Sequence, residues 1–156
     1  MMKTVKKKNN YNSGVTIVEL LIYIGLLTIF LTVLTTLFVS IFKLQLTTQS
    51  TSSLTQDTRF IIARMGYDIE NATSLAVPDP THLEFNETSS YYVDSGNLIL
   101  KIAGVGNKLN GLDTNINSIN FQKVSNTVQV IFTINSNVIE ESGPRSQTIQ
   151  TTYGLR

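Results

Sequence analysis

The sequence contains no cysteine and no tryptophan, and His82 is the only histidine among its 156 residues. The absence of cysteine excludes a disulfide framework, a cysteine-ligated zinc site and a thiol nucleophile. A single histidine disfavours a histidine-rich metal centre and a histidine-based catalytic triad. Because 12 basic residues stand against 11 acidic ones, the net charge of +1 also disfavours a strongly basic nucleic-acid-binding protein. The length fits one small domain with room for an appendage.

Charge is missing from the stretch Val15–Phe42, with the single exception of Glu19. As a helix, these 28 residues would measure about 42 Å, which exceeds the ~30 Å hydrocarbon core of a membrane. A buried helix of a soluble domain would be shorter and would carry a polar stripe. The polar side chains here are mainly threonine and serine, whose hydroxyls can bond to carbonyls of their own helix. We therefore predict a transmembrane helix.

The charges that flank this stretch predict its orientation. Of the charged residues after the stretch, only Lys43 lies close to it. The preceding residues 1–14 contain no acidic residue but have four lysines: Lys3, Lys6, Lys7 and Lys8. Since positively charged flanks stay in the cytoplasm, we expect a single-pass protein with a cytoplasmic N-terminus and an extracytoplasmic C-terminal part. A secretory signal core has ~7–15 apolar residues followed by an A-x-A pattern. This stretch is longer and lacks that pattern, so it should remain in the mature protein.

Glu19 is the unusual residue of the apolar stretch. In one interpretation it is shallow enough to reach the head groups and has no function. In the other it needs a positive partner, because a charge in lipid is expensive unless it is paired. A cut between Gly14 and Val15 would create an amine at Val15. That amine would lie one helical turn from Glu19, or could approach the Glu19 of a neighbouring chain.

The lysine-rich leader, Ser13-Gly14, and the following apolar residues with Glu19 among them closely resemble the prepilin cleavage and methylation motif. The resemblance implies that prepilin peptidase cuts after Gly14 and N-methylates Val15, and that Glu19 is the acid at the fifth mature position. Val15 departs from the family, which usually has Phe there. The family implied is that of type IV filament subunits: pilins, minor pilins and secretion pseudopilins.

Two further departures favour a minor pilin or pseudopilin over a major pilus subunit. Major pilins often have a proline where this chain has Thr36, and many close a loop with a disulfide that a cysteine-free chain cannot form. The resemblance leaves a pilus, a type II secretion system and a DNA-uptake system open. It implies as partners prepilin peptidase, other pilins or pseudopilins through helix bundling, the inner or plasma membrane, and an assembly platform. It gives no reason to expect direct binding to nucleic acid.

A second helical segment is predicted after the apolar stretch, over residues 43–74. Its apolar stripe has helical spacing: Leu54, Thr58, Ile61, Ile62, Met65, Ile69 and Ala72. The charged residues, among them the i,i+4 pair Arg64 and Asp68, fall largely off this stripe. Residues 47–53 contain neither glycine nor proline, so the helix can continue through them, and it must end before Pro78.

Residues 75–156 are predicted to form an extracytoplasmic β-sheet domain, because the apolar period changes to two. The expected strands are 82–87, 90–94, 97–103, 116–124, 127–135 and 147–155, with loops at 104–111 and 136–144. The predicted fold is therefore α+β and pilin-like, with one long N-terminal helix packed on a small antiparallel sheet. Residues 57–74 and the last strands loosely resemble J-type pseudopilins and W-type minor pilins.

Other chemical signals are weak. His82 is interpreted as a surface or strand-start residue. Gly104-Val105-Gly106 lacks the third glycine of a dinucleotide site. Glu140-Glu141, Asp79 and Asp113 are interpreted as solvated charges, since no calcium-binding loop motif is present. We expect no metal, no cofactor and no enzymatic activity, because no nucleophile and base can be assembled. The alternative to a filament subunit is a signal-anchored binding or sensor domain that does not polymerise.

Overall fold

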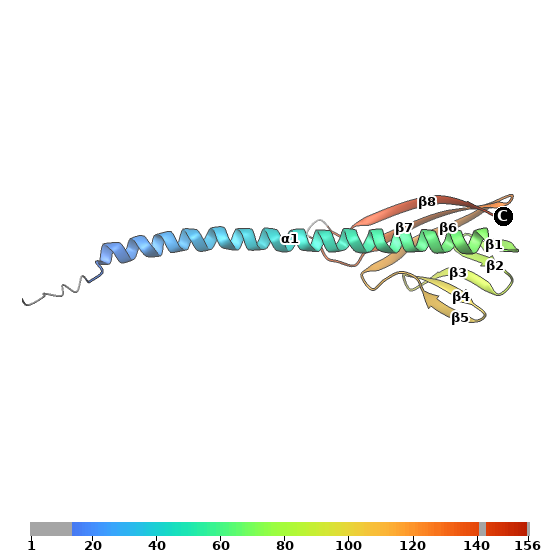
Figure 1. Ribbon diagram of the computed structural model, residues 1–156, viewed down its shortest axis with the longest axis horizontal. Helices are drawn as coiled ribbons and strands as arrows, with labels where there is room; N and C mark the ends of the chain where they lie inside the picture. The colour runs from blue at the N-terminus through green and yellow to red at the C-terminus, as the bar shows by residue number, and fades with distance from the viewer. Residues whose placement is uncertain (1–13, 141–142, 156) are drawn as a thin grey trace, which may run out of the picture. The chain divides into compact units, whose positions relative to one another are not determined.

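The structure is a computed structural model that describes residues 14–140 and 143–155. Over these residues one helix is followed by eight strands (Figure 1): α1 (Ile17–Glu70), β1 (Leu75–Asp79), β2 (His82–Phe85), β3 (Ser89–Asp94), β4 (Asn97–Ile102), β5 (Val105–Lys108), β6 (Thr114–Val124), β7 (Thr127–Ser136) and β8 (Ser146–Gly154). The predicted α+β fold is confirmed. The chain divides into two compact units after Ile41, and the second contains the rest of α1 and all the strands.

The local sequence explains where α1 begins and ends. The Thr16 hydroxyl accepts a hydrogen bond from the backbone N–H of Glu19 at 3.2 Å, which is the geometry of an N-cap. The predicted continuation through residues 47–53 is confirmed. The helix ends at Glu70, short of the predicted residue 74. Beyond it, the backbone N–H of Thr73 donates to Asn86 Oδ1 at 2.7 Å instead of to a helical carbonyl.

The predicted apolar stripe of the second helical segment is buried against the strands. Leu54, Ile61, Met65 and Ile69 are each at most 5% exposed. Asp68, which the spacing placed off the stripe, is also buried, because it receives a hydrogen bond from the Tyr91 hydroxyl of β3.

The strands form two antiparallel sheets rather than the one small sheet that was predicted, with the orders β1-β2-β3-β4-β5 and β6-β7-β8. The chain passes from one sheet to the other through residues 109–113. Asn110 fixes this crossing: its Oδ1 accepts from the Leu98 N–H at 2.9 Å and its Nδ2 donates to the Thr114 carbonyl at 2.8 Å. Two strands, β1 and β5, were not predicted from the sequence.

Helix and sheets share one core in the second unit. The alternation predicted for β7 is confirmed, since Val128, Val130, Phe132 and Ile134 are fully buried. Tyr153 of β8 packs on α1, and its hydroxyl donates to the Ile62 carbonyl at 2.9 Å. The other members of the core are Leu54, Ile61, Met65, Ile69, Ala72, Leu75, Leu83, Phe85, Tyr91, Leu98, Leu100, Ile116, Ile119 and Phe121.

Candidate functional site at the start of the helix

The peptide bond between Gly14 and Val15 precedes the helix. Both residues are exposed, and neither belongs to α1, which starts at Ile17. A Cβ added to Gly14 would meet nothing within 4 Å. Val15 is 65% exposed. This junction is therefore exposed backbone outside the helix, of the kind that a peptidase active site can reach. The leader residues Lys3, Lys6, Lys7 and Lys8 lie outside the described residues.

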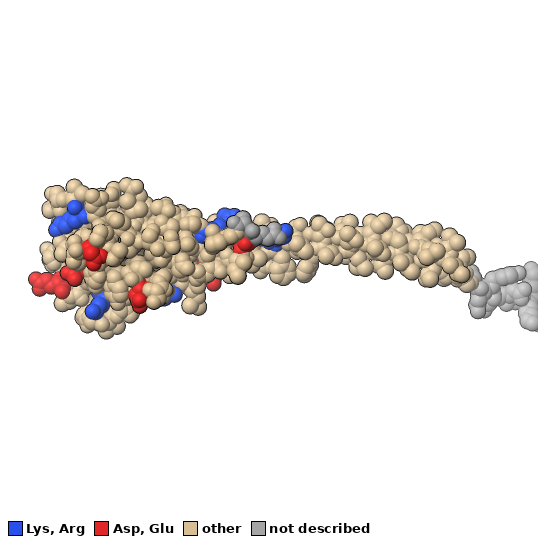
Figure 2. All heavy atoms as spheres, turned by 180° about the vertical axis from the view of Figure 1, so that it is seen from behind, with Lys and Arg blue, Asp and Glu red and all other residues tan. Residues whose placement is uncertain are grey.

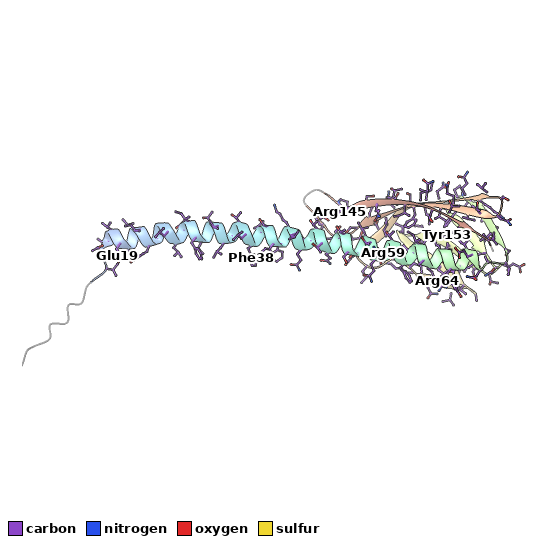
Figure 3. The ribbon with its side chains drawn as sticks, turned by 45° about the horizontal axis from the view of Figure 1, so that its top comes forward. Glu19, Phe38, Arg59, Arg64, Arg145 and Tyr153 are labelled. Atoms are coloured by element: carbon purple, nitrogen blue, oxygen red, sulfur yellow. The ribbon has the colours of Figure 1, made fainter. Side chains whose placement is uncertain are left out.

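Glu19 lies in the first turn of α1, at the end labelled in Figure 3. Its backbone N–H is bound by Thr16, and its Oε1 accepts a hydrogen bond from the Tyr23 hydroxyl at 2.8 Å. Tyr23 was not predicted from the sequence as a partner of Glu19, although the i,i+4 spacing places the two side chains on one helix face. A carboxylate oxygen accepts more than one hydrogen bond, so Tyr23 leaves acceptor capacity on Glu19.

The surface of α1 that follows Glu19 is apolar and exposed. Leu21, Leu27, Phe30 and Phe38 are each more than half exposed. The face seen in Figure 2 carries no Lys, Arg, Asp or Glu side chain over most of this length. Among the described residues, α1 is the helix that is long and apolar enough to cross a membrane, with a mean hydropathy of 2.5 over its most apolar window.

The hydroxyl groups of this stretch are satisfied within the helix. Each donates to the carbonyl four residues earlier at 2.8–2.9 Å: Thr28, Thr32, Thr35, Thr36 and Ser40. An unpaired hydroxyl in an apolar medium costs several kcal/mol, about 4–8 on a hydrocarbon scale. Because these donors are used, the threonines and serine do not oppose insertion into lipid.

Glu140 and Arg145, two charged residues of the second unit, are partners of each other. Glu140 precedes β8, and its side chain is only 7% exposed, so its interpretation as a solvated charge is wrong. It accepts hydrogen bonds from Arg145 and from the Thr47 hydroxyl, both at 3.3 Å. Burial opposes ionisation of this carboxyl, but the hydrogen bonds and the charge of Arg145 hold the pKa of Glu140 below its ordinary value. Figure 3 labels Arg145 next to α1. Glu141 lies outside the described residues.

The remaining candidates do not assemble into a site. His82 is confirmed as the first residue of β2, where it stacks on Tyr92 with ring centroids 5.7 Å apart. Asp79 is exposed as expected, and hydrogen bonds from the hydroxyl and backbone of Thr81 lower its pKa. In the described part of the chain, no three His, Asp or Glu side chains are grouped so that they could hold a metal ion.

The architecture of the described residues is pilin-like: a long apolar N-terminal helix whose later turns pack on antiparallel sheets. Of the residues singled out in the sequence, Gly14 and Val15 precede the first turn of this helix and Glu19 lies in it. Comparison of the chain with family models, with curated proteins and with solved structures finds no match.

Proposed function

We propose that this chain is a minor pilin or pseudopilin, a structural subunit of a type IV pilus, type II secretion or DNA-uptake filament. The observation that carries the proposal is the spacing at the start of α1. An open Gly14–Val15 junction precedes the helix, and one carboxylate, Glu19, follows it by one turn in an otherwise uncharged apolar surface.

Cleavage after Gly14 by prepilin peptidase removes the basic leader and leaves a new amine at Val15, which is N-methylated. The helix then waits in the inner or plasma membrane with the strands on the extracytoplasmic side. An assembly platform transfers the subunit into the filament, where helices bundle with those of other pilins or pseudopilins. Apolar side chains such as Leu27 and Phe38 exchange lipid for neighbouring helices, so their transfer changes their environment little.

Glu19 sets the register of the bundle by pairing with the Val15 amine of a neighbouring subunit. An unpaired charge in an apolar interior costs several kcal/mol, so a subunit shifted along the bundle would be rejected. Tyr23 holds Oε1 of the carboxylate at 2.8 Å and thereby orients it. The hydroxyl also lowers the cost of keeping the charge in the membrane before assembly.

Mass spectrometry of the protein from its host tests the proposal. The expected mature chain begins at methylated Val15. A chain that still starts at Met1 or Met2 would contradict processing and would support a signal-anchored domain that does not polymerise. That alternative explains the apolar stretch and the extracytoplasmic strands, but it gives no role to the junction at Gly14 or to Glu19.

Substitution of the carboxylate tests the pairing separately. Glu19→Gln keeps the shape of the side chain and removes the charge, so membrane insertion should persist while incorporation into filaments falls. Glu70→Gln is the matched control, since Glu70 is an exposed acid at the other end of the same helix. Tyr23→Phe keeps the carboxylate and should impair assembly less than Glu19→Gln. Normal incorporation of Glu19→Gln would refute the pairing.

A further inference from the structure

The strand β8 forms the outer edge of the three-stranded sheet (Figure 1). Its antiparallel pairing with β7 continues at both ends. The Ser136 N–H donates to the Arg145 carbonyl at 2.8 Å, and the Leu155 N–H donates to the Asn126 carbonyl at 2.9 Å. Residues of an antiparallel strand present their backbone groups alternately to the two sides. The odd-numbered residues of β8 therefore face β7, and the even-numbered residues face outward.

Five exposed residues of β8 present their backbone N–H and C=O groups outward: Ser146, Thr148, Gln150, Thr152 and Gly154. Over residues 14–140 and 143–155, no hydrogen bond reaches the backbone of these five residues. We call their N–H and C=O groups the β8 edge. Such a row of unpaired groups is a template for pairing with another strand.

The other strand edges of the structure are protected against such pairing. On β6, the Phe121 N–H donates to the Pro80 carbonyl of the other sheet at 2.7 Å. β1 contains Pro78 and a shift in register, and β5 has only four residues and ends in Lys108. Proline, bulges, short length and lysine all disfavour pairing between edges. β8 has none of these features, because its nine residues include no proline and no charge and its register with β7 does not shift.

A second copy of β8 is complementary to this edge. Gln150 is the middle residue of Ser146–Gly154, so antiparallel pairing centred on it brings Thr148 opposite Thr152 and Ser146 opposite Gly154. Each outward residue then meets another outward residue, and all the backbone groups of the edge gain partners. A two-fold axis repeats every side chain across such a contact, so charges of one sign would repel. β8 carries no charge, and paired threonines stabilise neighbouring strands.

We propose that two copies of this chain pair through their β8 edges, antiparallel about a two-fold axis at Gln150, and thereby join their three-stranded sheets into one continuous sheet. β8 runs in the same direction as the later turns of α1. Ser146, at its start, lines a groove with Thr51, and Tyr153, near its end, contacts Gly66. These turns therefore run in opposite directions in the two copies. Copies within the proposed filament run in the same direction, so the pairing goes beyond that function and joins copies of different assemblies.

The absence of native cysteine makes the register directly testable. Single-cysteine variants of the full chain in detergent are exposed to a mild oxidant, and disulfide-linked dimers are counted. The Cα atoms of a hydrogen-bonded antiparallel pair lie about 5.5 Å apart, which a disulfide can bridge. Gln150→Cys places its two cysteines at this distance across the axis. Thr148→Cys and Thr152→Cys are matched controls on the same strand, since each lies four residues, or roughly 14 Å along a strand, from its own counterpart.

Gln150→Cys should form the linked dimer severalfold faster than Thr148→Cys or Thr152→Cys alone, whereas an equal mixture of the two threonine variants should form it readily. Equal rates for all three single variants would overturn the proposal, because they would indicate random collision. The absence of any linked dimer from Gln150→Cys and from the mixture would overturn it as well. None of these outcomes depends on cleavage after Gly14, so the proposed function is tested separately.

A charge placed on the axis gives a second test without cysteine. Gln150→Lys brings two like charges together across the axis, so it should lower the dimer fraction of the full chain in sedimentation velocity at equal concentration. Gln122→Lys is the matched control, because Gln122 is an exposed residue of β6 in the same sheet. It should leave the dimer fraction unchanged. A dimer fraction of Gln150→Lys equal to that of Gln122→Lys would refute the pairing.

Discussion

The buried hydroxyl of Tyr91 should be one of the largest single polar contributions to the stability of the strand domain. Tyr91 is fully buried, and its hydroxyl donates to Oδ2 of Asp68 at 2.5 Å, joining β3 to α1. Arg64 Nε donates to the same oxygen at 2.9 Å. A hydrogen bond to a charged group contributes about 1.5–3 kcal/mol. Tyr91→Phe should lower the free energy of unfolding by that amount, because Asp68 then keeps only Arg64 as a partner among these contacts.

Urea unfolding of the detergent-solubilised chain, followed by the circular dichroism of its strands, measures this change. Tyr92→Phe is the matched control. Tyr92 is the next residue of the same strand, but it is only partly buried and stacks on His82, and the substitution keeps the ring. Its effect should stay within about 0.5 kcal/mol. If Tyr91→Phe costs no more than Tyr92→Phe, the argument from the buried hydroxyl is refuted.

The same contact predicts a dependence on alkaline pH. Burial, then the hydrogen bond to Asp68 and its negative charge, raise the pKa of Tyr91 far above its ordinary value. The unfolded chain loses the proton near pH 10, whereas the folded chain retains it. The stabilisation is thus complete below about pH 10 and is lost as pH rises further. Tyr91→Phe should flatten this decline, with the remainder due to Tyr153, whose pKa burial also raises.

Three further perturbations test other contacts. Because the pKa of folded Glu140 is lowered, its carboxylate stabilises the folded chain above about pH 4.3, and this stabilisation is lost as pH falls. Glu140→Gln should therefore make the free energy of unfolding less dependent on pH in the acidic range. Urea unfolding at pH 3–7 measures that dependence. Gly66→Ala should destabilise the folded chain despite a gain of about 1 kcal/mol in helix propensity, since the new Cβ would lie 3.0 Å from the Tyr153 ring. The direction of the change in melting temperature on thermal unfolding tests this. Asp57→Ala removes the acceptor for the Gly111 N–H at 2.7 Å and should increase hydrogen exchange in the β5–β6 loop.

The features predicted from the sequence are those that depend on local pattern. The apolar stretch is recognised by its uninterrupted length. The stripe from Leu54 to Ile69 has helical spacing and β7 alternates strictly, so each of these two elements reveals its buried side without knowledge of its partner. The two strands that were not predicted lack a clear alternation of apolar and polar residues. β1 contains Pro78 and a shift in register between Ala76 and Asp79. β5 is exposed throughout and contains Gly106, which leaves only its pairing with β4 to define it.

The burial of charged residues could not be predicted because their partners are distant in sequence. Asp68 meets Tyr91 23 residues later, and Glu140 meets Thr47 93 residues earlier. Spacing within α1 suggested only the Arg64–Asp68 pair, which the structure contains at 2.9 Å. The division into two sheets depends similarly on one buried amide, that of Asn110, which resembles any loop asparagine in the sequence.

Because the α1 hydroxyls bond within their own helix, they add little to the cost of moving that helix from lipid into a protein bundle. Thr28, Thr32, Thr36 and Ser40 already donate to their own backbone, so moving this segment from acyl chains to the interior of a protein bundle ruptures none of these bonds. Both media offer similar dispersion contacts. Transfer between the two media is therefore close to neutral along the length of the segment and can run in either direction; under the proposed function, Glu19 supplies the bias.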